Sequence, residues 1–216
     1  MNGGITSDRD AYKVVAILRD TPAQAILSTA QALYEGGIRA LELTFSQREP
    51  ERFQEIARQL TMLRQHFDGC MFIGAGTVIT EEQTELAHKA GAQFIVSPGV
   101  QKRVIQKAKE LEMLSLPGAM TPTEILTAYR WGADMVKVFP AGALGPSYIR
   151  AIRAPISHVP LLAVGGISSA NAAEFIKEGV VGVGAGGELV DKKAIAECRF
   201  DKLTEAAKML IHAVAL

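Results

Sequence analysis

Short apolar runs alternate with longer amphipathic stretches along almost the whole of this 216-residue chain. Eight runs, each about four to seven residues long, have the composition of buried strands, and the stretches between them have helical spacing. The runs are KVVAIL, ALELTF, MFIGAG, FIVSPG, MLSLPG, MVKVFP, LLAVGG and VVGVGAG. Strands that alternate with helices favour a parallel sheet covered by those helices.

No linker-like stretch interrupts the eight strand–helix units, so we expect a single domain over residues 1–216. Eight units favour an α/β fold closed into a (β/α)8 TIM barrel, whereas an open doubly wound sheet usually uses fewer strands. Three helix starts carry a threonine N-cap with Gln or Glu three residues later: TPAQ at Thr21, TEEQ at Thr80 and TPTE at Thr121. In such a barrel the ligand site lies at the carboxyl ends of the strands.

The composition excludes several classes of partner. The 23 basic residues balance 23 acidic ones, so no overall field attracts nucleic acid or an anionic membrane. The N-terminal MNGGITSDRD lacks a signal-peptide pattern, and no apolar run is long enough to span a bilayer. Cys70 and Cys198 stand alone and the four histidines are scattered, so neither a metal site nor a cofactor is predicted. We expect a cytoplasmic protein with reduced thiols.

Two charged residues interrupt apolar runs and are the first candidates for chemistry. Lys137 lies between two valines in MVKVFP, and a buried ammonium is unfavourable unless it is paired or neutral. In ALELTF the flanking leucines are expected to face the helices, which turns Glu42 toward the barrel interior. Two interpretations stay open: a buried ion pair that stabilises the barrel, or an amine nucleophile beside a carboxyl acid/base.

Small residues end the other strands and leave room for a ligand. Thr77 in GAGTV either caps a turn or donates its hydroxyl to a substrate carboxylate. Gly165 and Gly166 form a turn before ISSAN, where backbone N–H groups at a helix start can bind an anion. Barrel phosphate sites often follow the last two strands, so Gly186 and Gly187 are expected to complete this anion site. Their motif GVGAGG also matches the dinucleotide fingerprint, but no βαβ unit follows it.

The motifs GGIRALELTF, IGAGTV, FIVSPG, LPGAMTPTE, VKVFPAGALGPSYI and AVGGI together resemble the 2-keto-3-deoxy-6-phosphogluconate and 4-hydroxy-2-oxoglutarate aldolases. The likeness keeps the same order from Val14 to about Val190. These are class I pyruvate aldolases, (β/α)8 barrels that use no metal and are usually trimers. The resemblance implies a homotrimer that cleaves a small keto-acid substrate to pyruvate and an aldehyde, either glyceraldehyde 3-phosphate or glyoxylate.

The resemblance also implies roles for individual residues. Lys137 matches the Schiff-base lysine, and Glu42 matches the general acid/base. Thr77 matches a residue that binds the pyruvate carboxylate. Pro98 and Phe139 match walls of the pocket.

Three positions depart from the phosphogluconate enzymes. Ser46 stands where they typically carry arginine, Val164 replaces a threonine before the double glycine, and Gly187 replaces a frequent serine. AILR, which ends in Arg19, and AVGGI are more similar to the 2-keto-3-deoxy-6-phosphogalactonate aldolases. Arg19 is therefore a candidate cation either for the phosphate or, in place of the arginine absent at Ser46, for the pyruvate end.

Three alternatives stay open. The first is a 2-keto-3-deoxy-6-phosphogalactonate aldolase. The second is a phosphate-binding barrel isomerase or epimerase, which requires metal ligands or paired acids at strand ends that the sequence lacks. The third is a non-catalytic barrel, which has no need for both Lys137 and Glu42 inside.

Overall fold

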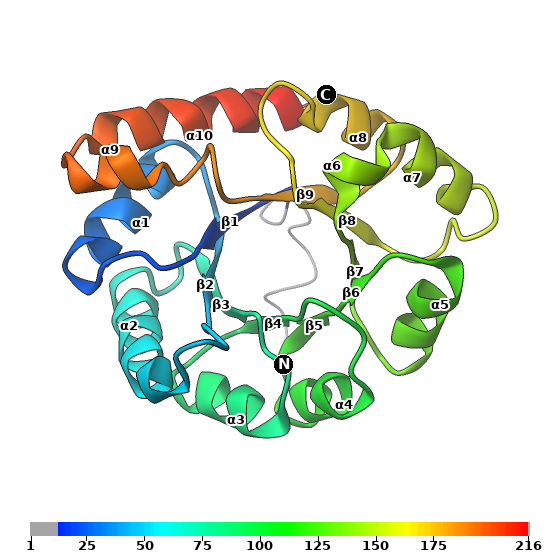
Figure 1. Ribbon diagram of the computed structural model, residues 1–216, viewed down its shortest axis with the longest axis horizontal. Coiled ribbons are helices and arrows are strands. Elements are labelled where there is room, and N and C mark those ends of the chain that lie inside the picture. The colour runs from blue at the N-terminus through cyan, green and yellow to red at the C-terminus, as the bar shows by residue number, and fades with distance from the viewer. Residues whose placement is uncertain (1–12, 216) are drawn as a thin grey trace.

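Nine parallel strands curl into a barrel surrounded by helices in the computed structural model, which describes residues 13–215 (Figure 1). The first strand pairs with the last, and the order around the sheet is β5-β4-β3-β2-β1-β9-β8-β7-β6. The strands are β1 (Val14–Leu18), β2 (Ala40–Thr44), β3 (Phe72–Gly76), β4 (Phe94–Val96), β5 (Leu114–Leu116), β6 (Gly118–Ala119), β7 (Val136–Val138), β8 (Leu161–Val164) and β9 (Gly182–Ala185). The predicted (β/α)8 barrel is confirmed.

The ninth strand arises because the predicted fifth strand is divided at Pro117. β5 pairs with β4, and β6 pairs with β7, so one chain segment joins the two edges of the sheet. Proline has no N–H to donate to the ladder, which interrupts the strand. The carbonyl of Pro117 still accepts a hydrogen bond from the N–H of Lys137 at 2.9 Å.

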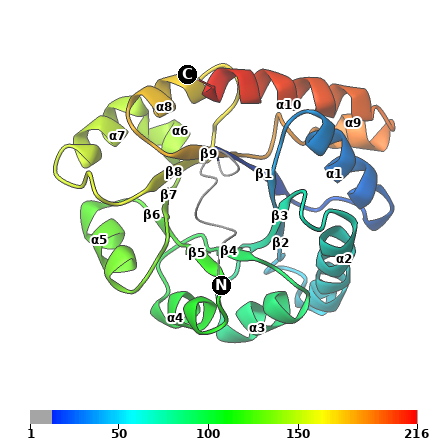
Figure 2. The same cartoon turned by 180° about the vertical axis from the view of Figure 1, so that it is seen from behind.

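Helices form the outer layer, and Figure 2 shows the same ring from behind. The helices after each strand are α1 (Ile26–Glu35), α2 (Phe53–His66), α3 (Glu81–Lys89), α4 (Lys102–Glu110), α5 (Pro122–Arg130), α6 (Ala141–Leu144), α7 (Pro146–Arg153), α8 (Ala172–Lys177), α9 (Lys192–Ala196) and α10 (Phe200–Val214). The last helix, α10, packs against α1 and α8 over the seam where the chain's first and last strands meet. Within residues 13–215 no helix is both long and apolar enough to cross a membrane.

Two of the three predicted helix caps are confirmed. The Thr80 hydroxyl accepts a hydrogen bond from the N–H of Gln83 at 3.2 Å, and Thr121 forms a reciprocal capping box with Glu124. The prediction for Thr21 is wrong. A short 3-10 turn (Ala23–Ala25) precedes α1, and the buried hydroxyl of Thr21 has no hydrogen-bond partner among the described residues.

The strand pleat divides the apolar residues into two layers. Leu41 and Leu43 of β2 belong to the large core between sheet and helices, whereas Ala40 belongs to a smaller cluster inside the barrel. Side chains alternate along a strand, so Glu42 lies on the interior side with Ala40. Val136 and Val138 of β7 likewise pack in the outer core, which confirms the predicted inward direction of the residue between them.

Two predictions reach beyond the described residues. The predicted domain spans residues 1–216, and residues 1–12 and 216 lie outside the part that the structure describes. The interpretation of the N-terminal stretch as something other than a signal peptide concerns the same outlying residues. Both stay predictions.

Candidate active site

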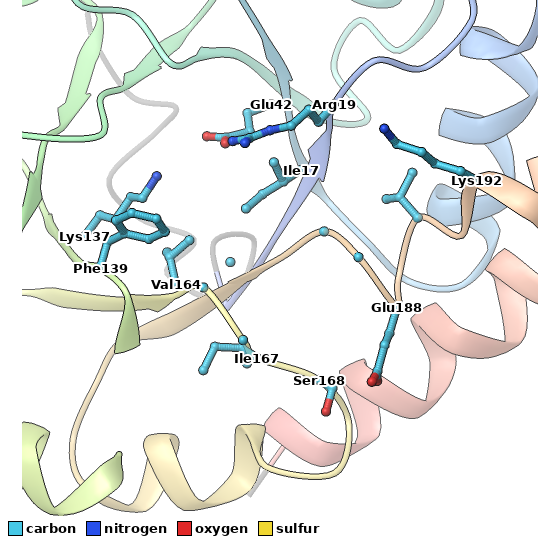
Figure 3. Close-up of a pocket in the computed structure, with 16 residues that line it drawn as sticks. Ile17, Arg19, Glu42, Lys137, Phe139, Val164, Ile167, Ser168, Glu188 and Lys192 are labelled. Carbon is cyan, nitrogen blue, oxygen red and sulfur yellow. The ribbon is translucent and has the colours of Figure 1, made fainter. Parts of the chain in front are cut away.

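A cavity of about 670 Å³ opens at the carboxyl ends of β1, β2, β7, β8 and β9 (Figure 3). Its position is the one expected for the ligand site of a (β/α)8 barrel. Nine predicted site residues line it: Arg19, Glu42, Lys137, Phe139, Val164, Gly165, Gly166, Gly186 and Gly187. The cavity therefore brings together predicted site residues that are up to 168 positions apart, from Arg19 to Gly187.

Lys137 enters the cavity from β7 and is only 7% exposed. Its Nζ lies 5.0 Å from the centroid of the Phe139 ring. Burial lowers the pKa of the Lys137 amine, and the charge of Arg19 lowers it further, while Glu42 acts in the opposite direction. The arrangement favours a neutral amine, which is the form that attacks a carbonyl carbon.

Glu42 enters from β2 and is 2% exposed. Burial raises the pKa of its carboxyl group, with the charges of Lys137 and Arg19 opposing that shift. A Cβ at Gly76 of β3 would lie 2.8 Å from the carboxyl carbon of Glu42, so only glycine leaves space for the acid there. Burial thus favours the protonated form of this carboxyl group more than in a glutamate that is exposed to water.

The two groups face the same space without bonding to each other. Figure 3 shows the ends of Glu42 and Lys137 directed into the cavity from different strands. Among the described residues, no hydrogen bond or ion pair joins them, although each perturbs the pKa of the other. This geometry favours an acid and an amine that are both available to a substrate over a closed structural ion pair.

Arg19 follows β1 directly and lies at the same end of the cavity. Its guanidinium extends beside Glu42 in Figure 3. Its positive charge lowers the pKa of both Glu42 and Lys137. Of the two roles considered for Arg19, the geometry supports the one at the amine end of the cavity.

The opposite end of the cavity is formed by the loops after β8 and β9. Within residues 13–215, the backbone N–H groups of its four glycines donate no hydrogen bond: Gly165, Gly166, Gly186 and Gly187. Gly165 has a φ of +90°, and a Cβ there would lie 2.9 Å from the Phe139 ring. Free backbone donors and the absence of side chains leave this end open to an anionic group.

The predicted helix behind the double glycine begins later than the sequence suggested. α8 starts at Ala172 and is six residues long. The intervening turn is held by Asn171, whose Nδ2 donates to the carbonyl of Gly166 at 2.9 Å and whose Oδ1 accepts from the N–H of Ser168 at 3.0 Å. The predicted anion site would therefore depend on the glycine turn itself, because no helix starts directly after it.

Three predicted substrate-binding residues do not line this cavity: Ser46, Thr77 and Pro98. Thr77 follows β3 with a φ of +57°, an unusual conformation for a β-branched residue, and its carbonyl accepts a hydrogen bond from Gln47 Nε2 at 2.8 Å. Ser46 is half-buried and Pro98 is exposed. Their roles stay predictions.

Six residues that line the cavity were missed by the sequence interpretation: Ile17, Ile167, Ser168, Glu188, Val190 and Lys192. Most of them follow the strand ends of β8 and β9 within a few positions. Their closeness to those ends was a usable signal for Ser168 and Glu188. Lys192 belongs to the next helix, so nothing in its local pattern indicates the cavity.

The side chains in this part of the molecule do not form a metal-binding set. Nowhere in residues 13–215 do three or more His, Cys, Asp or Glu side chains gather in a way that could hold a metal ion. The chemistry that these described side chains can supply is that of an amine and a carboxyl group.

A (β/α)8 barrel with a buried amine and a buried carboxyl group at its strand ends has the architecture of a class I aldolase, a carbon–carbon lyase. The family described as KDPG and KHG aldolase matches residues 5–206, and the chain belongs to that family. The family resemblance noted in the sequence is confirmed.

Individual relatives agree with this assignment. A probable 2-dehydro-3-deoxy-6-phosphogalactonate aldolase of Rhizobium meliloti is 38% identical over 82% of this chain and 81% of its own. A 2-dehydro-3-deoxy-phosphogluconate aldolase of Treponema pallidum is 32% identical over 96% of both chains. Among solved structures, a KDPG aldolase from Legionella pneumophila with pyruvate captured as a covalent carbinolamine superposes with a TM-score of 0.83, at 29% identity and over 94% of this chain and 95% of its own.

Proposed function

We propose that this chain cleaves a 2-keto-3-deoxy-6-phospho-sugar acid, of the gluconate or galactonate type, and 4-hydroxy-2-oxoglutarate to pyruvate and an aldehyde. The observation that carries the proposal is that Lys137 and Glu42 are both buried and both line the cavity, where burial lowers the pKa of the amine and raises the pKa of the carboxyl group. A phosphate-binding isomerase or epimerase requires metal ligands or paired acids at the strand ends, and residues 13–215 gather no set of metal ligands. A barrel that only binds a metabolite has no reason to bury both groups.

The first half of the reaction joins the substrate to the chain. The Lys137 amine attacks the C2 carbonyl and forms a carbinolamine. Glu42 donates its proton to the departing hydroxyl, so that water leaves and a protonated Schiff base forms. Glu42 is then a carboxylate and can act as a base.

The second half breaks the carbon–carbon bond. Glu42, directly or through a water, removes the proton of the C4 hydroxyl, and the C3–C4 bonding electrons move into the Schiff base. The aldehyde leaves, the resulting enamine takes a proton at C3, and water releases pyruvate from Lys137. A preorganised acid/base of this kind typically contributes about 10²–10⁴-fold to the rate.

The ends of the substrate are assigned by charge. At the pyruvate end, Arg19 is the side-chain cation beside Glu42 and Lys137 and is proposed to bind the substrate carboxylate, with Thr77, Ser46 and Pro98 as predicted neighbours. At the aldehyde end, the free glycine N–H groups are proposed to bind phosphate, next to Val164. The galactonate-type substrate is supported by the 38% identical relative.

Reductive trapping tests the reaction class. Incubation with pyruvate and borohydride should add a reduced pyruvyl group to Lys137, located by peptide mass spectrometry. Cleavage kinetics with the phosphogluconate, phosphogalactonate and hydroxyglutarate substrates, measured side by side, then identify the aldehyde. If no adduct forms with an active-site lysine, the aldolase proposal fails and the isomerase or binding alternatives remain.

A homotrimer in the cytoplasm is proposed for the assembled enzyme. The trimer follows the usual state of the family that the sequence resembles. The cytoplasmic location is supported by Cys70 and Cys198, which are exposed and unpaired thiols. Light scattering coupled to size exclusion measures the assembly directly.

A further inference from the structure

The aldehyde end of the cavity carries two charged side chains that the reaction scheme does not use. Both come from the segment after β9. Glu188 and Lys192 line the cavity together with Gly186 and Gly187. The phosphate-binding side chains expected from the phosphogluconate enzymes are replaced by Val164 and Gly187, which have no hydroxyl. These two charges are therefore the side chains available to decide how an anion binds here.

Lys192 is held at the cavity by the cap of α9. The Asp191 carboxylate accepts hydrogen bonds from the N–H groups of Lys193 and Ala194, at 2.8 and 3.3 Å, and so caps α9 at its first residue, Lys192. In Figure 3 the Lys192 side chain enters from the right, across the cavity from Lys137 on the left. A second, separate amine thus lies across the cavity from the proposed nucleophile.

The ammonium of Lys192 is free to change partner at little cost. Its Nζ lies 3.2 Å from the carboxylate of Asp20, and the two side chains are 68% and 51% exposed. Exposed ion pairs of this kind contribute little to stability. A phosphate group binds an ammonium more strongly than an exposed carboxylate does, because it brings more charge and more acceptor oxygens.

The other charges around the cavity leave the far end to Lys192. Arg19 extends beside Glu42 and acts on the pKa of both catalytic groups, so it belongs to the pyruvate end. Glu188 points to the side of Ser168, away from Lys192 in Figure 3. An anion on the Ser168 side would meet this carboxylate, whereas an anion on the other side meets the ammonium.

We propose that Lys192 is a specificity-determining residue that binds the terminal phosphate of the substrate together with the backbone N–H groups of Gly186 and Gly187, and that Glu188 keeps the phosphate on that side. An exposed lysine from the last loop thereby substitutes for hydroxyl groups that this chain lacks. The inference rests on the proposed aldolase function and adds the residue that recognises phosphate.

Paired lysine variants test the inference. Lys192→Met removes the ammonium, and Lys193→Met is the matched control, because Lys193 is the adjacent exposed lysine and pairs with Glu197 away from the cavity. KM is measured for the phosphorylated sugar acid and for the same sugar acid without phosphate. We expect Lys192→Met to raise KM for the phosphorylated substrate, relative to KM for the substrate without phosphate, roughly tenfold. This is the effect of losing one charge-assisted hydrogen bond.

Two further variants test whether the charge at each position changes the affinity for phosphate in the expected direction. Lys192→Arg should keep most of the preference for phosphate, and Glu188→Gln should lower KM for the phosphorylated substrate. Equal KM ratios for Lys192→Met and Lys193→Met would overturn the inference. An unmodified chain that forms no trapped pyruvate adduct would instead overturn the proposed function, so the two failures are distinguishable.

Discussion

The two ends of the cavity differ in burial and in the groups that they offer to the proposed substrate. At the pyruvate end, Lys137 and Glu42 project from the strands and are almost fully buried. At the aldehyde end, the backbone N–H groups of the glycine loops have no hydrogen-bond acceptor among the described residues, and the Lys192 side chain is 68% exposed. One end thus presents two side chains that are shielded from water, and the other presents hydrogen-bond donors that are exposed to water.

This contrast separates the groups proposed for the chemistry from those proposed for recognition. Burial shifts the pKa of Lys137 down and that of Glu42 up, and it needs the whole barrel to exclude water around both groups. Backbone N–H groups bind an anion whatever side chains surround them. Loop substitutions at the aldehyde end can therefore alter substrate choice without touching the pKa values that drive the reaction.

The largest effect is expected from removing the nucleophile. Lys137→Ala and Lys137→Arg should both abolish cleavage and adduct formation, because neither side chain offers a neutral primary amine. Mass spectrometry after borohydride treatment and a thermal melt measure the adduct and the fold. The fold should persist, and an adduct on any other lysine would show that the pyruvate end has been misassigned.

The next largest effect concerns Glu42. Glu42→Gln keeps the volume and most hydrogen bonds but cannot exchange a proton, so kcat should fall by about 10²–10⁴-fold with little change in melting temperature. Steady-state kinetics measures kcat, and calorimetry measures the melting temperature. A large stability loss with nearly normal turnover would instead support the buried ion pair considered for the sequence.

A smaller effect is expected at the aldehyde end, where a hydroxyl can be restored. A Cβ at Gly187 meets no atom within 4 Å, so Gly187→Ser fits without strain. One neutral hydrogen bond of about 1 kcal/mol should lower KM for the phosphorylated substrate roughly fivefold. Gly187→Ala is the control, and an equal change in both variants would mean that the hydroxyl does not reach the phosphate.

Substitution of Arg19 should change the pH dependence of the reaction more than it changes the maximum rate. Its charge lowers the pKa of Lys137, so Arg19→Leu should raise that pKa and leave less neutral amine at a given pH. The acidic limb of the pH profile for pyruvate trapping should therefore move to higher pH. Arg19→Lys keeps the charge and should keep the profile. If Arg19→Leu instead changes only KM for the phosphorylated substrate, Arg19 belongs to the aldehyde end.

No effect is expected from metal removal. The described residues 13–215 gather no set of ligands for a metal ion, and the two halves of the proposed reaction use only the amine and the carboxyl group. Cleavage rates should be equal before and after dialysis against EDTA. Activity lost to EDTA and restored by a divalent cation would contradict the class I mechanism.

Some features of the fold followed from local patterns, and others did not. The alternating runs predicted the barrel, and the pleat of ALELTF and MVKVFP predicted that Glu42 and Lys137 face inward. The division of the fifth strand at Pro117 had a visible signal in the proline itself. Thr21 was misjudged because a TPAQ motif also fits a 3-10 turn placed ahead of the helix.

The two candidate reacting groups could be identified from the sequence alone, because side chains alternate along a strand and an inward lysine or glutamate can be read directly. The side chain proposed to recognise phosphate came to light only in the folded barrel. Lys192 reaches the cavity because β1 pairs with β9, which sets Asp20 against the start of α9 across 172 positions of chain. Contacts of that kind depend on closure of the whole barrel, and no short-range pattern encodes them.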